Sequence, residues 1–385
     1  MRRVHGPVHN PVGVLLLPLR LSPPTQYTDE LIATARAIAS PGKGILAADE
    51  STGTIGKRFA SIGVENTHEN RLKYRQFLFE TSGLSEYISG VIMYEETLFD
   101  KRPSDGKALI DICKENGMIA GIKVDMGVRP LPGTDGETVT QGLTGLGARC
   151  AKYYAQGARF AKWRAVCKIS DSGCPSQLSM QQNAETLARY AVICQANGLV
   201  PIVEPEVLMD GAHTLEVCAA KTQAVQAEVM KKLHEHHILW EGMLLKPNMV
   251  VHGAECATPA TNAACAAATV RVLQRTLPAA CPGVTFLSGG MSEVDATSRI
   301  NFMNNLELGA RPWSLSFSFG RALQKSCLAV WKGEDANIAA AQSALLFRAK
   351  ANGLAQLGQY KGEDGASDIA AEAAAASMFI KNYSY

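Results

Sequence analysis

Eight short apolar segments recur along the chain, and their alternation with helical segments limits the possible folds more than any other feature. They cover 44–50, 90–96, 118–125, 159–166, 199–207, 242–250, 283–290 and 312–320. Intervening stretches such as 183–198, 214–236 and 337–353 carry hydrophobic residues at helical spacing. Eight strands separated by helices over about 290 residues predict an α/β fold, a single (β/α)8 TIM barrel. A doubly wound sheet is disfavoured, because no G-x-G-x-x-G motif follows the first strand.

The two ends of the chain differ from this repeating region, which we expect to span residues 28–355. Residues 1–27 contain arginines and no acidic residue. This composition fits either a disordered extension or an organellar transit peptide, so the compartment is left open between the cytoplasm and an organelle (plastid, glycosome or mitochondrion). Residues 356–385 are rich in small residues and end on Tyr385. They predict a mobile C-terminal arm.

Composition excludes several classes of partner. The 38 basic and 36 acidic side chains give a net charge of +2, which does not indicate nucleic acid as the main ligand. No apolar run approaches the length of a membrane span, so we expect no membrane partner. The ten cysteines include no C-x-x-C pair and are typical of reduced core thiols in a reducing compartment.

Charged and hydroxyl side chains gather at the carboxyl ends of the predicted strands. In a barrel these ends share one face, where the active site of this architecture lies. Residues two apart on a strand point to the same side, so Lys123 and Asp125 are expected to face the same way. The polar residues at or near the strand ends are Asp49, Glu95, Glu96, Lys123, Asp125, Lys162, Arg164, Glu204, Glu206, Lys246, Ser288, Ser318 and Arg321.

Several lysines beside carboxylates suggest covalent chemistry at this face. A lysine buried close to a second ammonium group is expected to have a lowered pKa. Its neutral amine attacks carbonyl groups and forms Schiff bases, and nearby carboxylates can move the protons involved. The lysine in "GMLLKPNMVV" (242–251) is followed by a proline, which cannot donate to a strand ladder.

Glycine turns and basic residues near the same face predict phosphate binding. The first turn combines Ser288, Gly289 and Gly290, and the second combines Ser318, Gly320 and Arg321. Backbone N–H groups in such turns bind anions, and arginine binds phosphate through two hydrogen bonds. A further anion site is expected in "DESTGTIGKR" (49–58), from Ser51, Thr54, Lys57 and Arg58. The substrate is therefore expected to carry phosphate, at both ends if both sites are used.

No motif in the sequence predicts a metal site. The cluster "HEHH" (234–237) fits neither H-E-x-x-H nor a zinc finger, and we interpret it as the solvated end of a helix. The alternating aromatics of "WSLSFSF" (313–319) are more typical of barrel packing than of base stacking.

The segments "GILAADESTGTIGKR", "GIKVD", "FAKWR", "VEPEV", "LWEGMLLKPN", "FLSGG" and "SFSFGRAL", with the terminal tyrosine, resemble class I fructose-bisphosphate aldolase. The resemblance runs from about Thr28 to Tyr385 and implies the same barrel, a homotetramer, and no metal or organic cofactor. It implies reversible cleavage of fructose 1,6-bisphosphate to dihydroxyacetone phosphate and glyceraldehyde 3-phosphate. Phe319 and Thr54 depart from the tyrosine and serine common in the family.

Individual roles follow from this resemblance. Lys246 is similar to the Schiff-base lysine. Glu204, with Glu206 beside it, resembles the acid/base of dehydration. Asp49 resembles the base at the C4 hydroxyl, Lys162 the residue that stabilises charge there, and Tyr385 the group that transfers a proton at C3. The implied phosphate contacts are Ser288, Gly289, Gly320 and Arg321 on one side and Ser51, Thr54, Lys123 and Arg164 on the other.

Two other functions are compatible with parts of this pattern. A transaldolase-like Schiff-base enzyme would not need phosphate sites at both ends, whereas this chain carries Ser288/Arg321 and Ser51/Arg164. A non-catalytic scaffold with the aldolase fold would be favoured if the reactive residues were missing, but Lys246 and the neighbouring carboxylates are present.

Overall fold

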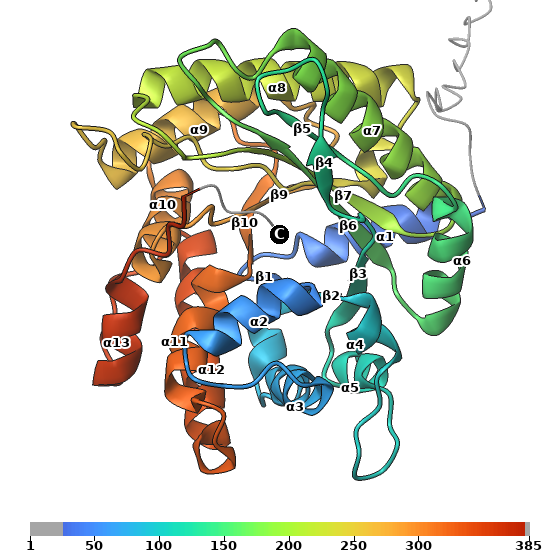
Figure 1. The fold of residues 1–385 in the computed structure, drawn as a ribbon, viewed down its shortest axis with the longest axis vertical. Coiled ribbons are helices and arrows are strands. Elements are labelled where there is room, and N and C mark those ends of the chain that lie inside the picture. The colour runs from blue at the N-terminus through green and yellow to red at the C-terminus, as the bar shows by residue number, and fades with distance from the viewer. Residues whose placement is uncertain (1–25, 382–385) are drawn as a thin grey trace, which may run out of the picture.

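The eight predicted strands close into one parallel barrel with helices outside it (Figure 1). We describe residues 26–381 from a computed structural model. The barrel order is β1-β10-β9-β8-β7-β6-β3-β2. The strands are β1 (Gly44–Ala48), β2 (Ile88–Met93), β3 (Ile119–Lys123), β6 (Phe160–Cys167), β7 (Val200–Val207), β8 (Leu244–Leu245), β9 (Gly283–Phe286) and β10 (Ser314–Phe319). The predicted TIM barrel is confirmed.

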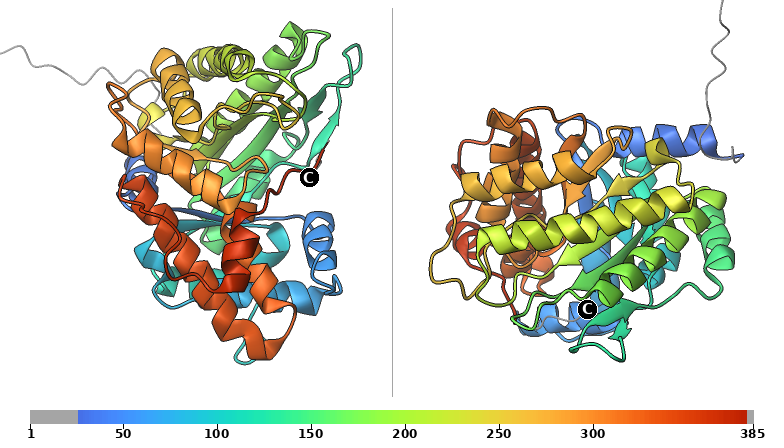
Figure 2. Two further views of the ribbon diagram at one scale, coloured as in Figure 1. Left: turned by 90° about the vertical axis from the view of Figure 1, so that its left-hand side faces the viewer. Right: turned by 90° about the horizontal axis from the view of Figure 1, so that it is seen from above.

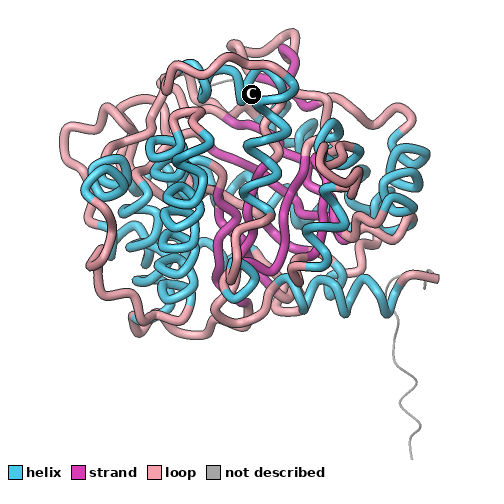
Figure 3. Tube along the Cα trace, turned by 90° about the horizontal axis from the view of Figure 1, so that it is seen from below, coloured by secondary structure: helices cyan, strands magenta, loops and turns pink. Residues whose placement is uncertain are grey.

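Helices surround the barrel, as seen from below in Figure 3. They are α1 (Thr28–Ile38), α2 (Thr52–Ala60), α3 (His68–Phe79), α4 (Glu95–Phe99), α5 (Leu109–Glu115), α6 (Leu146–Gln156), α7 (Gln177–Ala196), α8 (Leu215–Glu235), α9 (Asn262–Thr276), α10 (Glu293–Asn305), α11 (Arg321–Trp331), α12 (Ile338–Gln356) and α13 (Asp368–Ala375). Several begin at a serine or threonine cap, such as Ser176 before α7 and Thr214 before α8. None of the described helices is long and apolar enough to cross a bilayer.

On β6 and β7 the interior of the barrel changes from apolar to charged along the strand. On β6 the inward positions run Phe160, Lys162, Arg164, and on β7 Ile202 precedes Glu204 by two residues. Phe160 and Ile202 belong to a buried cluster that α1 also joins at the amino-terminal end of the barrel. A Cβ on Gly121 would lie 2.2 Å from the Phe160 ring, so only glycine fits on β3 beside this aromatic. Apolar side chains thus fill the barrel interior at the amino-terminal ends of the strands, and polar side chains occupy it at the carboxyl-terminal ends.

Strand β8 is much shorter than the predicted segment 242–250. It pairs with β7 only at Leu244 and Leu245, and the Lys246 N–H then donates to the Val203 carbonyl at 2.8 Å. Pro247 follows without an N–H, so the ladder ends there. Lys246 therefore lies where the strand stops and the mouth of the barrel begins.

Two segments lie outside the barrel pattern. The antiparallel hairpin of β4 (Val128–Pro130) and β5 (Thr138–Thr140) follows β3 and projects beside the mouth (Figure 2). The predicted C-terminal arm contains α13, which packs against α11. The arm then contacts the barrel mouth, because the Met378 N–H donates to the Gly290 carbonyl at 3.0 Å. Residues 1–25 and 382–385 lie outside the described residues, so the domain boundaries stay predictions.

The predicted role of most cysteines is confirmed. All ten are free, and nine of them are buried, with Cys256 partly exposed. The nine buried cysteines fill space as small apolar residues.

Candidate active site

The strand ends enclose a cavity of about 440 Å³ at the mouth of the barrel. Fourteen predicted site residues line it: Asp49, Ser51, Arg58, Lys123, Lys162, Arg164, Glu204, Glu206, Lys246, Ser288, Gly289, Ser318, Gly320 and Arg321. Its lining includes eight arginine or lysine side chains and six carboxylates, which gives a net charge of +2. Such a cavity suits a small anionic ligand.

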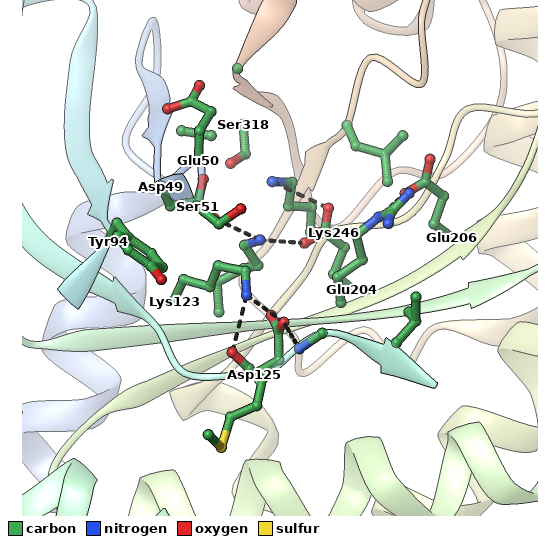
Figure 4. A pocket seen from close by; sticks show the side chains of 18 of the residues that line it. Asp49, Glu50, Ser51, Tyr94, Lys123, Asp125, Glu204, Glu206, Lys246 and Ser318 are labelled. Carbon is green, nitrogen blue, oxygen red and sulfur yellow. Dashed lines mark hydrogen bonds and ion pairs between the residues drawn. The ribbon is translucent and has the colours of Figure 1, made fainter. Parts of the chain in front are cut away.

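Strand register brings the reactive groups together. Lys123 on β3 pairs in register with Lys162 on β6, and Arg164 on β6 pairs with Glu204 on β7. Partners in register on parallel strands point to the same side of the sheet, so all four side chains face the barrel interior. Figure 4 shows Lys123, Glu204 and Lys246 converging from three strand ends.

Glu204 lies between two lysines. Its Oε1 is 3.3 Å from the Lys246 Nζ, and its Oε2 is 3.4 Å from the Lys162 Nζ. All three residues are at least 95% buried. A carboxylate in this position can exchange protons with the Lys246 amine or with a group attached to it.

Asp49 and Lys162 form an ion pair in the site, 2.7 Å from Oδ2 to Nζ. Burial alone would raise the pKa of Asp49, but the ammonium groups of Lys162 and Lys246 lower it to about 2. Burial opposes the charged form of Lys162, yet Asp49 and Glu204 hold its pKa well above the usual range. The expectation of a lowered lysine pKa is therefore wrong for Lys162, because two carboxylates outweigh desolvation.

The lowered pKa of Asp49 makes stability depend on acid pH. Because its folded pKa of about 2 lies below the unfolded value of about 3.9, ionised Asp49 stabilises the fold above that value. This contribution, about 2–3 kcal/mol, is lost as the pH falls toward 2. We expect Asp49→Asn to lower the free energy of unfolding at neutral pH and to match the wild type near pH 2. Urea unfolding across this range measures the difference, with the exposed Asp111→Asn as the control; a difference that does not depend on pH would contradict the prediction.

The remaining cations at the mouth are held by carboxylates or carbonyls. Arg164 is paired with Glu206, and Lys123 is paired with Asp125, whose backbone carbonyl also accepts from it at 3.0 Å. Arg321 donates to the Met378 carbonyl at 2.6 Å. Each of these cations lines the cavity and is bound to a neighbouring group.

Three predicted phosphate contacts do not line the cavity. The Thr54 hydroxyl is buried and lies 3.0 Å from the Ser51 hydroxyl, so it supports Ser51. Lys57 is exposed on α2. Gly290 lines a neighbouring hollow beneath the arm. Tyr385 lies outside the described residues.

Some lining residues were not among the predicted site residues. Glu50 follows Asp49 directly and points away from it, toward Arg58 and Arg75. Arg149 and Tyr153 come from α6, where a spacing of four residues on one helical face was the available signal. The predicted strand 90–96 was too long, since Glu95 and Glu96 begin α4. Glu95 still lies just after β2 and lines the cavity, as expected of a residue near a strand end.

Neither candidate metal cluster belongs to this site. His234, His236 and His237 lie at the end of α8, as predicted, and the His236 Nε2 is 3.1 Å from Glu185. Ligand atoms of His68, Glu96 and Asp100 lie within 4.8 Å of one another. Both Glu96 oxygens accept hydrogen bonds from Arg71, at 2.8 and 2.7 Å, and we therefore assign no ion to this group.

Comparison with known proteins identifies the family. The family model described as fructose-bisphosphate aldolase class-I matches residues 30–385. This chain belongs to the class I fructose-bisphosphate aldolases. It is 58% identical to a fructose-bisphosphate aldolase of Dictyostelium discoideum over 363 residues, covering 94% of this chain and 99% of the relative.

Further relatives agree with this assignment. The cytosolic fructose-bisphosphate aldolase 6 of Arabidopsis thaliana is 57% identical over 361 residues, 94% of this chain and 99% of the relative. A crystal structure of the Plasmodium falciparum aldolase, solved with TRAP and a small-molecule inhibitor, superposes with a TM-score of 0.86. It is 52% identical and covers 89% of this chain and 99% of that chain.

Proposed function

We propose that this aldolase cleaves fructose 1,6-bisphosphate reversibly to dihydroxyacetone phosphate and glyceraldehyde 3-phosphate through a Schiff base on Lys246. One observation carries the proposal: at the end of β8, the buried Lys246 amine lies 3.3 Å from the carboxylate of Glu204. The amine attacks the C2 carbonyl and gives a carbinolamine. Glu204 supplies a proton to the departing hydroxyl, so that water leaves and an iminium forms.

Cleavage then uses the Asp49–Lys162 pair. Asp49, which is ionised at neutral pH, accepts the proton of the C4 hydroxyl while the C3–C4 bond breaks. The bonding electrons move into the iminium and form an enamine, and glyceraldehyde 3-phosphate departs. The charged Lys162 stabilises the oxygen that becomes the aldehyde. Tyr385 returns a proton to C3, and hydrolysis releases dihydroxyacetone phosphate.

The direct test is borohydride trapping with fructose 1,6-bisphosphate, with and without EDTA, followed by peptide mass mapping. We expect a reduced adduct on Lys246 in both cases. A folded protein that binds the sugar phosphate without forming an adduct would contradict the Schiff-base route. An adduct that disappears with EDTA would show that a metal takes part.

The two phosphates are proposed to bind on opposite sides of the cavity. Ser288, Gly289, Gly320 and Arg321 would hold the C1 phosphate, and Ser51, Lys123 and Arg164 the C6 phosphate. We expect Arg164→Ala to raise KM for fructose 1,6-bisphosphate roughly 10–100-fold and to leave KM for fructose 1-phosphate nearly unchanged. Arg321→Ala should raise both. Steady-state kinetics with the two sugars measure this, and equal effects of Arg164→Ala on both substrates would contradict the placement.

Assembly and compartment are proposed from the family alone. We propose a homotetramer, to be tested by light scattering on the eluting peak of a sizing column. We also propose a cytoplasmic location, supported by relatives named cytosolic or cytoplasmic from Arabidopsis thaliana and Pisum sativum. Imaging a fusion that keeps residues 1–27 would distinguish this from an organellar location.

A further inference from the structure

Strand β1 ends beside its neighbour β10 before it reaches Asp49. The two strands pair only at Ile45 with Ser318 and at Leu46 with Phe319. Beyond that point β10 gives way to Gly320 and α11, so the ladder on this side of β1 stops. Backbone carbonyls that are buried without a ladder partner need another donor.

Side chains from two helices supply these donors. Gln324 of α11 donates from Nε2 to the Ala47 carbonyl at 2.7 Å. Arg75 of α3 donates to the Ala48 carbonyl, and its Nη2 lies 3.4 Å from the Glu50 carbonyl. The carbonyls on both sides of Asp49 are therefore held by groups that are not part of the barrel sheet.

Further contacts fix the donors themselves. The Tyr74 hydroxyl donates to the Gln324 Oε1 at 2.7 Å, which turns the amide nitrogen toward Ala47. The Glu50 carboxylate accepts from Arg75 at 2.6 Å and from Gln324 at 3.2 Å. Gln324 and Tyr74 are fully buried, and Arg75 is 3% exposed. A buried arginine and a buried amide in one network leave little freedom for the backbone they bind.

We propose that Gln324 and Arg75 are positioning residues for Asp49: they fix the backbone at the end of β1 so that its carboxylate meets the C4 hydroxyl of the substrate. This inference rests on the proposed function, because it assigns Asp49 to the cleavage step. Neither residue lines the cavity, so both act through the backbone. A displacement of about 1 Å at a reacting group can cost roughly 100-fold in rate.

The test separates cleavage from Schiff-base formation. Dihydroxyacetone phosphate forms a Schiff base with Lys246 without needing a base at C4. For Gln324→Leu we expect kcat for fructose 1,6-bisphosphate to fall about 100-fold with KM changed by less than about threefold. The rate of borohydride trapping with dihydroxyacetone phosphate should stay near that of the wild type.

Gln195 offers a matched control. It is a buried glutamine whose Nε2 donates to the Leu239 and Gly242 carbonyls at 2.8 and 3.0 Å, before β8 begins. Gln195→Leu removes the same kind of contact far from Asp49, so it should lower the melting temperature but leave kcat unchanged. Tyr74→Phe keeps Gln324 but removes the hydroxyl that donates to its Oε1. The amide is then held less firmly against Ala47, and we expect kcat to drop roughly 3–10-fold.

The outcomes are distinct. Wild-type kcat in Gln324→Leu, or an equal loss of trapping and cleavage, would overturn the positioning role. If Gln324→Leu does not fold, a Tyr74→Phe variant with unchanged kcat would overturn it. Failure of the wild type to form an adduct on Lys246 would instead contradict the proposed function itself.

Discussion

Replacing Lys246 by arginine is expected to lower the cleavage rate by at least about 10⁴-fold and to abolish the borohydride adduct. Arginine keeps a positive charge next to Glu204, so its guanidinium can take the place of the Lys246 amine in the ion pair with Glu204, which is 3.3 Å long in the wild type. It remains protonated and cannot act as the amine nucleophile. The loss would therefore report the missing covalent step and not a collapse of the charge network.

The geometry also explains why Lys246, and neither of its neighbours, is the expected nucleophile. Lys162 contacts both Asp49 and Glu204, and these carboxylates hold its pKa well above the usual range. Lys123 binds both the side chain and the backbone carbonyl of Asp125. Lys162, kept charged in this way, stabilises anions but does not attack a carbonyl. Lys123 is held at Asp125, on the side proposed for the C6 phosphate.

Lys123→Arg serves as the control for this experiment. Because Lys123 is proposed to contact only the C6 phosphate, its variant should still be trapped by dihydroxyacetone phosphate at Lys246. An adduct on Lys162 or Lys123 in the Lys246→Arg protein, with cleavage retained, would show that the nucleophile has been assigned to the wrong residue.

Strand pattern and side-chain parity were enough to predict the barrel and most of the candidate site. Alternation by two along β6 and β7 places Lys162, Arg164, Glu204 and Glu206 inside, because a barrel strand has only an inner and an outer side. The sequence predicts less well which helical residues near the mouth face the cavity. Lys57 was predicted by its nearness to Ser51 in sequence, yet the turn of α2 carries it to the surface.

What could not be predicted depends on contacts between distant segments. Gln324 reaches Ala47 across 277 positions, and Tyr74 reaches Gln324 across 250. A buried glutamine in an amphipathic helix has no local pattern that distinguishes it from a surface one. The predicted strand 242–250 was likewise too long. Strand β8 pairs with β7 only at Leu244 and Leu245, and Pro247 has no N–H to continue the ladder.

The second large effect is expected for Glu204→Gln, which we predict to lower kcat about 10³-fold. The amide keeps the size of the side chain but cannot donate a carboxyl proton to the departing hydroxyl or accept one from the amine. Lys162 keeps its ion pair with Asp49 at 2.7 Å, so we expect the remaining charged side chains to stay in position. Trapping with dihydroxyacetone phosphate should slow in parallel with cleavage, because both need the iminium.

Glu206→Gln provides the matched comparison. Glu206 is two residues further along β7 and is paired with Arg164, on the side proposed for the C6 phosphate. Its loss should change KM for fructose 1,6-bisphosphate more than it changes trapping by dihydroxyacetone phosphate. Rapid-quench measurement of adduct formation in both variants decides the matter. Glu206→Gln could slow adduct formation as much as Glu204→Gln does. The two carboxylates would then share the proton transfer, and the contact between Glu204 and Lys246 would not decide which of them protonates the departing hydroxyl.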